Sequence, residues 1–216
     1  MSKLKCGLIQ MGLKGEVSMG PSMLRDRMIE AHLPLIDKAG AAGVQVLCFQ
    51  EIFTQPYFCP SQDRKWYAAA EAVPDGYTTK FMQEYAKKYR MVMVVPVYEE
   101  AMAGVYYNTA AVIDADGKYL GKYRKTHIPQ VDPGFYEKFF FKPGDLGYPV
   151  FQILAQSRDR RGRIEQVSVG TRAAGIGRRE RRVHRRDQPR RQGRALGGED
   201  GRVLRLQLHR QSAGEN

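Results

Sequence analysis

Apolar side chains follow two different spacings along the first 152 residues and predict alternating strands and helices. Residues 5–10 alternate in polarity, as expected for a half-buried strand. Residues 44–48 and 91–97 are mostly apolar, which is typical of strands buried on both faces. Residues 22–38 and 78–90 place their apolar side chains on one helical face and predict amphipathic helices.

Local signals refine these elements. Residues 106–114 and 119–123 flank Ala115-Asp116-Gly117-Lys118 and predict a hairpin, because Asp-Gly favours a tight turn. In the first helix, Ser22 is the expected N-cap and Pro34 the expected site of a kink. Strands that alternate with helices and end in a hairpin predict an α/β protein with a mixed sheet.

Charge and composition divide the chain into two parts. The 216 residues carry a net charge of +12. Residues 1–152 hold 18 Lys and Arg against 16 Asp and Glu, whereas residues 153–216 hold 17 against 7. All basic residues of the second part are Arg, and it contains no Phe, Tyr or Trp. We therefore expect one domain over residues 1–152 and a poorly structured, Arg-rich tail over residues 153–216.

The cysteines and the apolar content indicate the compartment. Cys6, Cys48 and Cys59 show no disulfide spacing, which favours a reducing environment. No apolar stretch approaches the roughly 20 residues that a membrane span requires. The first ten residues lack the apolar region of a secretory signal. We expect a cytoplasmic protein that does not contact a membrane.

Two acids and a lysine are the candidate catalytic residues. Glu51 follows the buried strand at 44–48, Lys125 follows the second strand of the hairpin, and Glu137 is surrounded in sequence by aromatic residues. Charged groups at strand ends in apolar surroundings have perturbed pKa values, which is typical of acid–base sites. His127 is a further candidate base or ligand, although a single histidine is more often structural. We find no metal-ligand spacing and no phosphate-binding glycine loop, and we expect no cofactor.

Three motifs in order carry a family resemblance. With FQEIF at 49–53, YRKTHIP at 123–129 and FYEKFFFKPGDLGYPVF at 135–151, the chain resembles the nitrilase superfamily of carbon–nitrogen hydrolases. Within it, the chain is most similar to bacterial β-ureidopropionases (N-carbamoyl-β-alanine amidohydrolases), followed by N-carbamoylputrescine amidases. The resemblance covers residues 1–152 without interruption.

The resemblance implies a fold and a mechanism. It implies an αββα sandwich, here truncated, and a Glu–Lys–Cys mechanism acting on a small N-carbamoyl or amide substrate, as in pyrimidine degradation. Glu51 matches the general base, Lys125 matches the lysine that stabilises the oxyanion, and Glu137 matches a second glutamate that positions lysine and substrate. Intact members commonly form homo-oligomers.

The nucleophile of the family has no counterpart here. The family continues after PVFQ with a strand and an elbow that bears the cysteine in a CYDRHFPE-like motif, whereas this chain runs from Gln152 into Ile153-Leu154-Ala155. Cys6, Cys48 and Cys59 all lie outside such an elbow. We interpret them as small buried side chains or loop thiols.

The tail is consistent with a shifted reading frame. Codons exist that encode residues 163–174 in this frame and ASSRYLWELEQP one nucleotide later, which is a family-like segment. The same holds for residues 185–192 (AAINRVGK) and 199–214 (KMGEFYGSSYIANPRG), in the family's order. We therefore hypothesise a deletion on the order of 30 residues, from typical element lengths, and a frameshift just after Leu154.

Three functions follow for testing. The first is an amidohydrolase by descent that is inactive as this chain. The second is a non-catalytic subunit that docks on intact relatives. The third is nucleic-acid binding through Arg clusters in the tail at 178–182 and 185–191, which is disfavoured because the tail offers neither an aromatic residue for stacking nor a known binding module.

Overall fold

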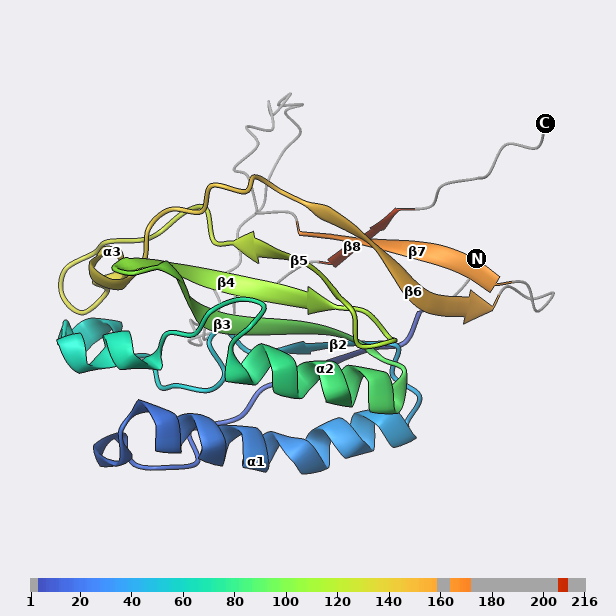
Figure 1. The fold of residues 1–216 in the computed structure, drawn as a ribbon, viewed down its shortest axis with the longest axis horizontal. Helices are drawn as coiled ribbons and strands as arrows, with labels where there is room; N and C mark the ends of the chain where they lie inside the picture. Colours follow the sequence, from blue (N-terminus) through green and yellow to red (C-terminus); the bar gives the residue numbers. More distant parts are fainter. Residues whose placement is uncertain (1–3, 159–163, 172–205, 210–216) are drawn as a thin grey trace, which may run out of the picture.

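The computed structural model describes residues 4–158, 164–171 and 206–209 (Figure 1). Its centre is a five-stranded sheet in the order β1-β2-β3-β4-β5. β1, β2 and β3 pair in parallel, and β4 and β5 add antiparallel strands. The bounds are Cys6–Ile9, Val46–Phe49, Val92–Met102, Val105–Ile113 and Tyr119–Arg124. The mixed sheet and its closing hairpin confirm the predicted α/β class.

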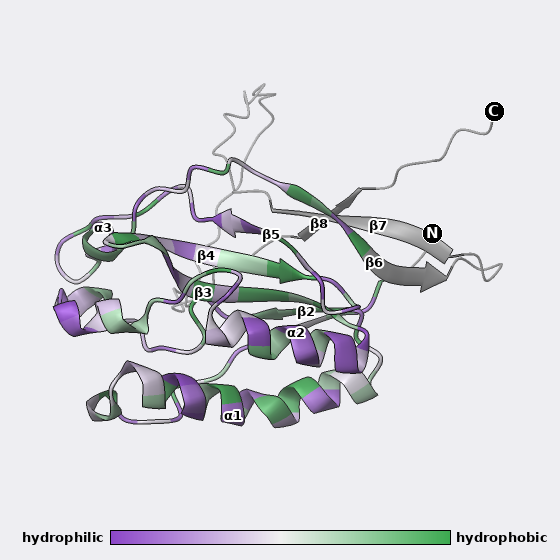
Figure 2. Cartoon of the chain, viewed as in Figure 1, coloured by the Kyte–Doolittle hydropathy of each residue, from purple (hydrophilic) through white to green (hydrophobic). Residues whose placement is uncertain are grey.

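Two long helices cover one face of this sheet (Figure 1). They are α1 (Pro21–Ala41) and α2 (Tyr77–Tyr89). Figure 2 shows that β3 and β4 are largely hydrophobic, whereas hydrophobic and hydrophilic residues alternate along both helices. The largest core lies between the helices and the sheet, because the apolar faces of the helices meet every second residue of the strands there. Its buried members include Ile29, Ile36, Leu47, Phe53, Met82, Met93, Val95 and Ile113.

The start of α1 differs from the sequence prediction. Ser22 is not the N-cap, because the helix begins at Pro21 and Gly20 occupies the cap position without a side-chain bond. Proline suits the first helical position, since its missing N–H would have no partner there. The helix continues without a break through Pro34, where we expected a kink. No helix in the described part of the chain is both long and apolar enough to cross a membrane.

A second, aromatic core lies beside the carboxyl end of β3. The short helices η2 (Cys59–Ser61), η3 (Arg64–Ala69) and α3 (Glu137–Phe140) contribute Cys59, Trp66, Ala69 and Phe140 to it. Phe58 lies at its centre, 5.3 Å from Trp66, 5.4 Å from Tyr98 and 4.8 Å from Phe140 between ring centroids. These contacts hold the 55–69 and 137–141 segments together, although they are about 70 residues apart in sequence.

Three further strands follow residue 149. They are β6 (Val150–Arg158), β7 (Ile164–Thr171) and β8 (Leu206–His209), which form a separate antiparallel sheet. Phe151 and Ile153 of β6 pack with Val46, Val92 and Val112 of the first sheet. The predicted disordered tail over 153–216 therefore includes three stretches that the structure describes as strands. The rest of that tail lies outside the described residues, where the prediction stays a prediction.

Candidate active site

The topology brings the candidate residues to one edge of the five-stranded sheet. β2 and β5 run in the same direction, because β2 is parallel to β3 and two antiparallel steps separate β3 from β5. Glu51 lies two residues beyond β2, and Lys125 directly follows β5. α3 begins at Glu137 on the same side of the molecule (Figure 1). These three residues come from widely separated sequence motifs, and the structure places them together.

Lys125 lies between the two carboxylates. Its Nζ is 3.0 Å from Glu51 Oε1 and 2.6 Å from Glu137 Oε2. The Glu137 side chain is 9% exposed and the Lys125 side chain 24%. Glu137 therefore has the apolar surroundings that the sequence predicted. Glu51 does not, because its side chain is 61% exposed.

The exposure of Glu51 follows from the turn after β2. Ile52 has φ of 43°, which is rare for a branched side chain and marks a sharp reversal of the backbone. The side chains of Ile52 and Phe53 are buried. Burying these two apolar neighbours holds the turn and leaves the carboxylate directed away from the core.

Asn108 is a fourth member of the cluster that the sequence did not single out. Its side-chain Nδ2 donates to Glu51 Oε1 at 2.6 Å. Its backbone carbonyl accepts a hydrogen bond from the backbone N–H of Lys125 at 2.8 Å. Asn108 is buried in β4, beside the buried Thr109 and ahead of the apolar residues 110–113. A buried amide in such a strand needs hydrogen-bond partners, and this was the signal that could have identified it.

The two carboxylates keep Lys125 charged. Burial acts to lower the pKa of the Lys125 ammonium, but the charge of Glu51 and the hydrogen bonds to Glu137 and Glu51 outweigh burial, so the pKa lies above its ordinary value. A cation of this kind can stabilise a developing oxyanion. It cannot act as a nucleophilic amine near neutral pH, because the free base is scarce.

The described thiols are held in their protonated form. Burial and the charge of Glu137 raise the pKa of Cys59 to about 12, although Lys125 acts in the opposite direction. Cys59 shares a hydrogen bond with Tyr57 and belongs to the same electrostatic neighbourhood as the site, which its sequence position did not reveal. Burial raises the pKa of Cys48 to about 11 and also raises that of the exposed Cys6. No described thiol is thus an activated nucleophile.

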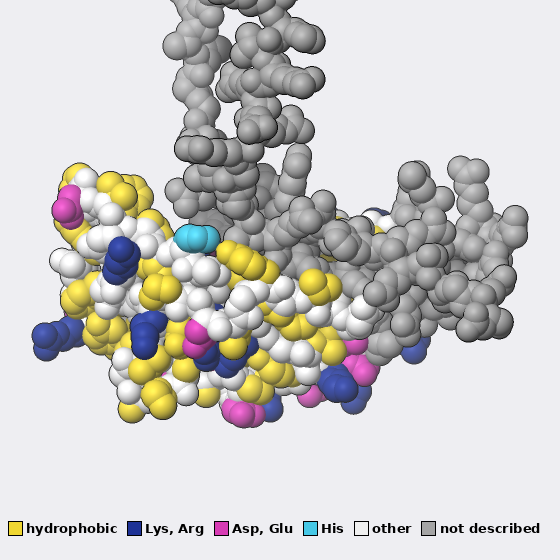
Figure 3. Space-filling model, turned by 90° about the horizontal axis from the view of Figure 1, so that it is seen from above, with side chains coloured by type: hydrophobic (Ala, Val, Ile, Leu, Met, Phe, Trp, Pro, Cys, Tyr) yellow, Lys and Arg dark blue, Asp and Glu magenta, His cyan; other side chains and the backbone are white. Residues whose placement is uncertain are grey.

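An apolar surface surrounds the cluster. Figure 3 views the side of the molecule opposite α1 and α2, where apolar side chains are spread among few charged ones. Tyr57 and Phe135 are 55% and 52% exposed, and their ring centroids lie 6.3 Å apart. Val131 pairs with Phe135 and is also exposed. His127 is exposed near the same segment. Within residues 4–158, 164–171 and 206–209, no three His, Cys, Asp or Glu side chains are placed to hold a metal ion.

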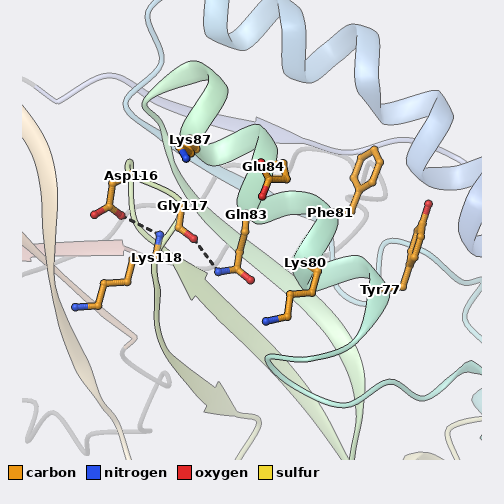
Figure 4. A pocket seen from close by; sticks show the side chains of 9 residues that line it. All are labelled: Tyr77, Lys80, Phe81, Gln83, Glu84, Lys87, Asp116, Gly117 and Lys118. Carbon is orange, nitrogen blue, oxygen red and sulfur yellow. Dashed lines mark hydrogen bonds between the residues drawn. The ribbon is translucent and has the colours of Figure 1, made fainter.

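An open cavity lies elsewhere on the molecule. It has a volume of about 680 Å³ and lies between α2 and the β4–β5 turn (Figure 4). Gln83 Nε2 donates to Gly117 O at 2.8 Å across its floor. Its lining is Tyr77, Lys80, Phe81, Gln83, Glu84, Lys87, Asp116, Gly117 and Lys118. It shares no residue with the Glu51–Lys125–Glu137 cluster and is not the candidate active site.

Comparison with known proteins agrees with this geometry. The carbon–nitrogen hydrolase family model matches residues 7–158. A β-ureidopropionase of Arabidopsis thaliana is 47% identical over 123 residues, which cover 56% of this chain and 30% of that protein. An N-carbamoylputrescine amidase of the same plant is 43% identical over 118 residues, covering 55% and 39%.

The solved structures show the same fold. A carbon–nitrogen hydrolase from Helicobacter pylori G27 is 30% identical with a TM-score of 0.59, covering 71% of this chain and 50% of that one. The chain thus spans half or less of the length of these relatives. The matched range contains all three residues of the cluster. The chain belongs to the carbon–nitrogen hydrolase family, the nitrilase superfamily.

Proposed function

We propose that this chain derives from an amidohydrolase that cleaves the C–N bond of a small N-carbamoyl amine or amide, of the N-carbamoyl-β-alanine type met in pyrimidine degradation. The observation that supports it is the Lys125 ammonium held at 3.0 Å and 2.6 Å from Glu51 and Glu137. The similarity to a β-ureidopropionase and an N-carbamoylputrescine amidase supports the substrate class. A cytoplasmic location and homo-oligomeric intact relatives belong to the same proposal.

The roles of the residues follow from their chemistry. In the amidohydrolase from which this chain derives, Glu51 is the general base. It removes the proton of the family's cysteine thiol and returns it to the departing amine. Lys125 stabilises the oxyanion that forms when sulfur attacks the carbonyl carbon. Glu137 keeps Lys125 charged and in place. Water then hydrolyses the thioester, and the thiol is regenerated.

The chain as it stands does not complete this reaction. The family's cysteine elbow has no counterpart after Gln152, and the high pKa of Cys59 removes the nearest alternative. A deletion and a frameshift near Leu154 account for the change in composition. We therefore propose a catalytically silent member with an intact acid–lysine cluster.

Two measurements test this proposal together. The gene is sequenced across codons 148–216, and ammonia release from N-carbamoyl-β-alanine and N-carbamoylputrescine is measured with the 216-residue chain. We expect no turnover above a Lys125→Met control. If the 216-residue chain turns over substrate and Lys125→Met abolishes that turnover, the proposed inactivity is overturned. Should sequencing restore the elbow and the family frame, we expect the restored chain to hydrolyse one of these substrates.

A second candidate is a non-catalytic subunit. Its supporting observation is that the matched region covers 50% of the Helicobacter pylori hydrolase and less of the curated relatives. Co-expression with an intact relative and copurification at fixed stoichiometry would favour it. The third function, nucleic-acid binding, depends on Arg clusters outside the described residues, and any such binding should weaken steeply with salt.

A further inference from the structure

A buried ion network lies next to the site. Glu99 of β3 is fully buried and accepts hydrogen bonds from three side chains. Lys122 Nζ donates at 2.5 Å, Arg124 at 2.6 and 3.0 Å, and Thr109 Oγ1 at 2.5 Å. Burial acts to raise the pKa of Glu99, but these donors outweigh it and the pKa lies below its ordinary value. The carboxylate is therefore charged and fully satisfied.

This network crosses three neighbouring strands. Glu99 lies on β3, Thr109 on β4, and Arg124 is the last residue of β5. Thr109 and Arg124 are register partners. The ion pair thus joins β5 to β3 across β4. Charge-assisted bonds to a planar guanidinium allow few alternative geometries, particularly when the carboxylate is buried.

Arg124 is also restrained from its outer side. Its Nη1 donates to Asp145 Oδ1 at 2.9 Å, and its guanidinium lies 3.9 Å from the centroid of the Tyr107 ring. Gly144 N–H donates to the carbonyl of Lys125 at 2.8 Å. The side chain of Arg124 and the backbone of Lys125 are thus both held in place.

The network and the candidate site lie on opposite faces of the sheet. Neighbouring residues in a strand point to opposite faces, and pairing with β4 continues through Lys125 because its N–H donates to Asn108 O. The Arg124 side chain contacts Glu99, whereas the Lys125 side chain contacts Glu51 and Glu137. A displaced Arg124 would therefore move the backbone that carries the Lys125 ammonium.

We propose that Arg124, held by Glu99, is a positioning residue that sets the Lys125 ammonium between Glu51 and Glu137. This inference rests on the proposed role of Lys125. Its test measures the reactivity of the amine rather than turnover, so the two proposals can fail separately. Simple stabilisation of the fold is the alternative, since buried ion networks are often only structural.

The test is trace acetylation of the full chain with acetic anhydride from pH 7 to 11. Labelling of the Lys125 peptide is quantified by mass spectrometry against an added lysine peptide. If Arg124 positions Lys125, then Arg124→Gln separates the ammonium from its carboxylates and lowers its pKa. Below that pKa, the free-base fraction rises about tenfold for each unit by which the pKa falls, so labelling speeds up even though a less basic amine is a weaker nucleophile. Loss of the Arg124 positive charge acting only through space would have the opposite sign and slow the labelling.

Further variants make the result decisive. Arg124→Lys keeps the charge but not the planar contact and should speed labelling of Lys125. Glu99→Gln should also speed it, but loss of the Glu99 negative charge acts in the same direction through space, so Arg124→Lys is the deciding variant. Val95→Ala is the control, because it opens the buried core on the same strand without contacting the network. It should lower the melting temperature and leave Lys125 labelling unchanged. Unchanged or slower labelling in Arg124→Lys and Arg124→Gln would overturn the proposal, and Arg124→Lys decides alone if Arg124→Gln does not fold.

Discussion

Lys125 shows how a half-buried cation is kept charged at a strand end. Desolvation alone would favour the neutral amine, yet Glu51 and Glu137 both contact Nζ. The two contacts differ in kind. Glu51 is largely exposed, so solvent weakens its pairing, whereas Glu137 is almost fully shielded from water. The pair with Glu137 is therefore expected to contribute more to holding the lysine.

His32 is a buried titratable residue beneath the same turn. It is fully buried in α1, with ring centroids 4.8 Å from Phe53 and 5.8 Å from Phe49. Its Nδ1 donates to the Met28 carbonyl at 2.6 Å, and its Nε2 has no partner among the described residues. Burial lowers the pKa of His32, against the smaller effect of the bond to Met28. The ring is therefore neutral in the folded protein near pH 7.

This predicts loss of stability in mild acid. The unfolded chain takes up a proton at His32 below about pH 6.5, where the folded chain does not, so the free energy of unfolding falls as pH falls. The slope from this one residue is at most about 1.4 kcal/mol per pH unit. Urea unfolding between pH 7.5 and 5.5 measures it. His32→Phe should flatten the dependence, whereas the buried, non-titrating Leu24→Ala should lower stability but keep the slope. Equal slopes in parent and His32→Phe would contradict the prediction.

At the scale of elements, a glycine controls how the α3 segment meets β5. A Cβ on Gly144 would lie 2.1 Å from the carbonyl oxygen of Arg124, closer than real side chains approach. The close approach allows Gly144 N–H to reach Lys125 O, and it keeps Glu137 at a fixed distance from Lys125. The spacing between the α3 segment, which carries Glu137, and the end of β5, which precedes Lys125, thus depends on Gly144 having no side chain.

Gly144→Ala should therefore destabilise the fold and loosen the site. The backbone of Arg124 cannot move easily, so we expect a loss of about 1–3 kcal/mol in the free energy of unfolding, typical of overpacking. Urea unfolding measures this loss. Gly12→Ala is the matched control, since its added Cβ would meet no atom within 4 Å. A Gly144→Ala chain as stable as Gly12→Ala would contradict the close approach.

At the scale of the whole molecule, the described part of the chain leaves a sheet edge at β1. β1 is the first strand in the sheet order, and its Leu8 is 70% exposed. An edge strand with an exposed apolar side chain offers both hydrogen-bonding groups and apolar surface to another chain.

We predict self-association through this edge. Leu8→Lys should shift the chain toward the monomer in sedimentation velocity, because a charge on an edge strand opposes pairing. Met23→Lys is the control, since Met23 is 57% exposed but lies on α1 rather than on the edge strand. If both variants associate as the parent does, β1 is not the contact.

Much of the fold was predictable because it depends on local periodicity. The apolar runs at 44–48 and 91–97 and the Asp-Gly turn correctly predicted β2, β3 and the β4–β5 hairpin. The start of α1 was mispredicted, because Ser22 and Pro21 are both acceptable near a helix start and the proline lies at the first position. The catalytic roles of Glu51, Lys125 and Glu137 stay a prediction, although the three side chains do meet.

The sequence by itself determined the order and type of the main elements from β1 to β5, the family, and which charged residues stand at strand ends, because these depend on neighbours along the chain. Only the tertiary structure decided that Glu51 is exposed, that Asn108 and Cys59 lie in the same neighbourhood, and that Arg124 is held by Glu99. The Asn108–Glu51 and Arg124–Glu99 contacts join residues that are 57 and 25 positions apart. They depend on strand register and on the packing of the aromatic core, which no local pattern specifies.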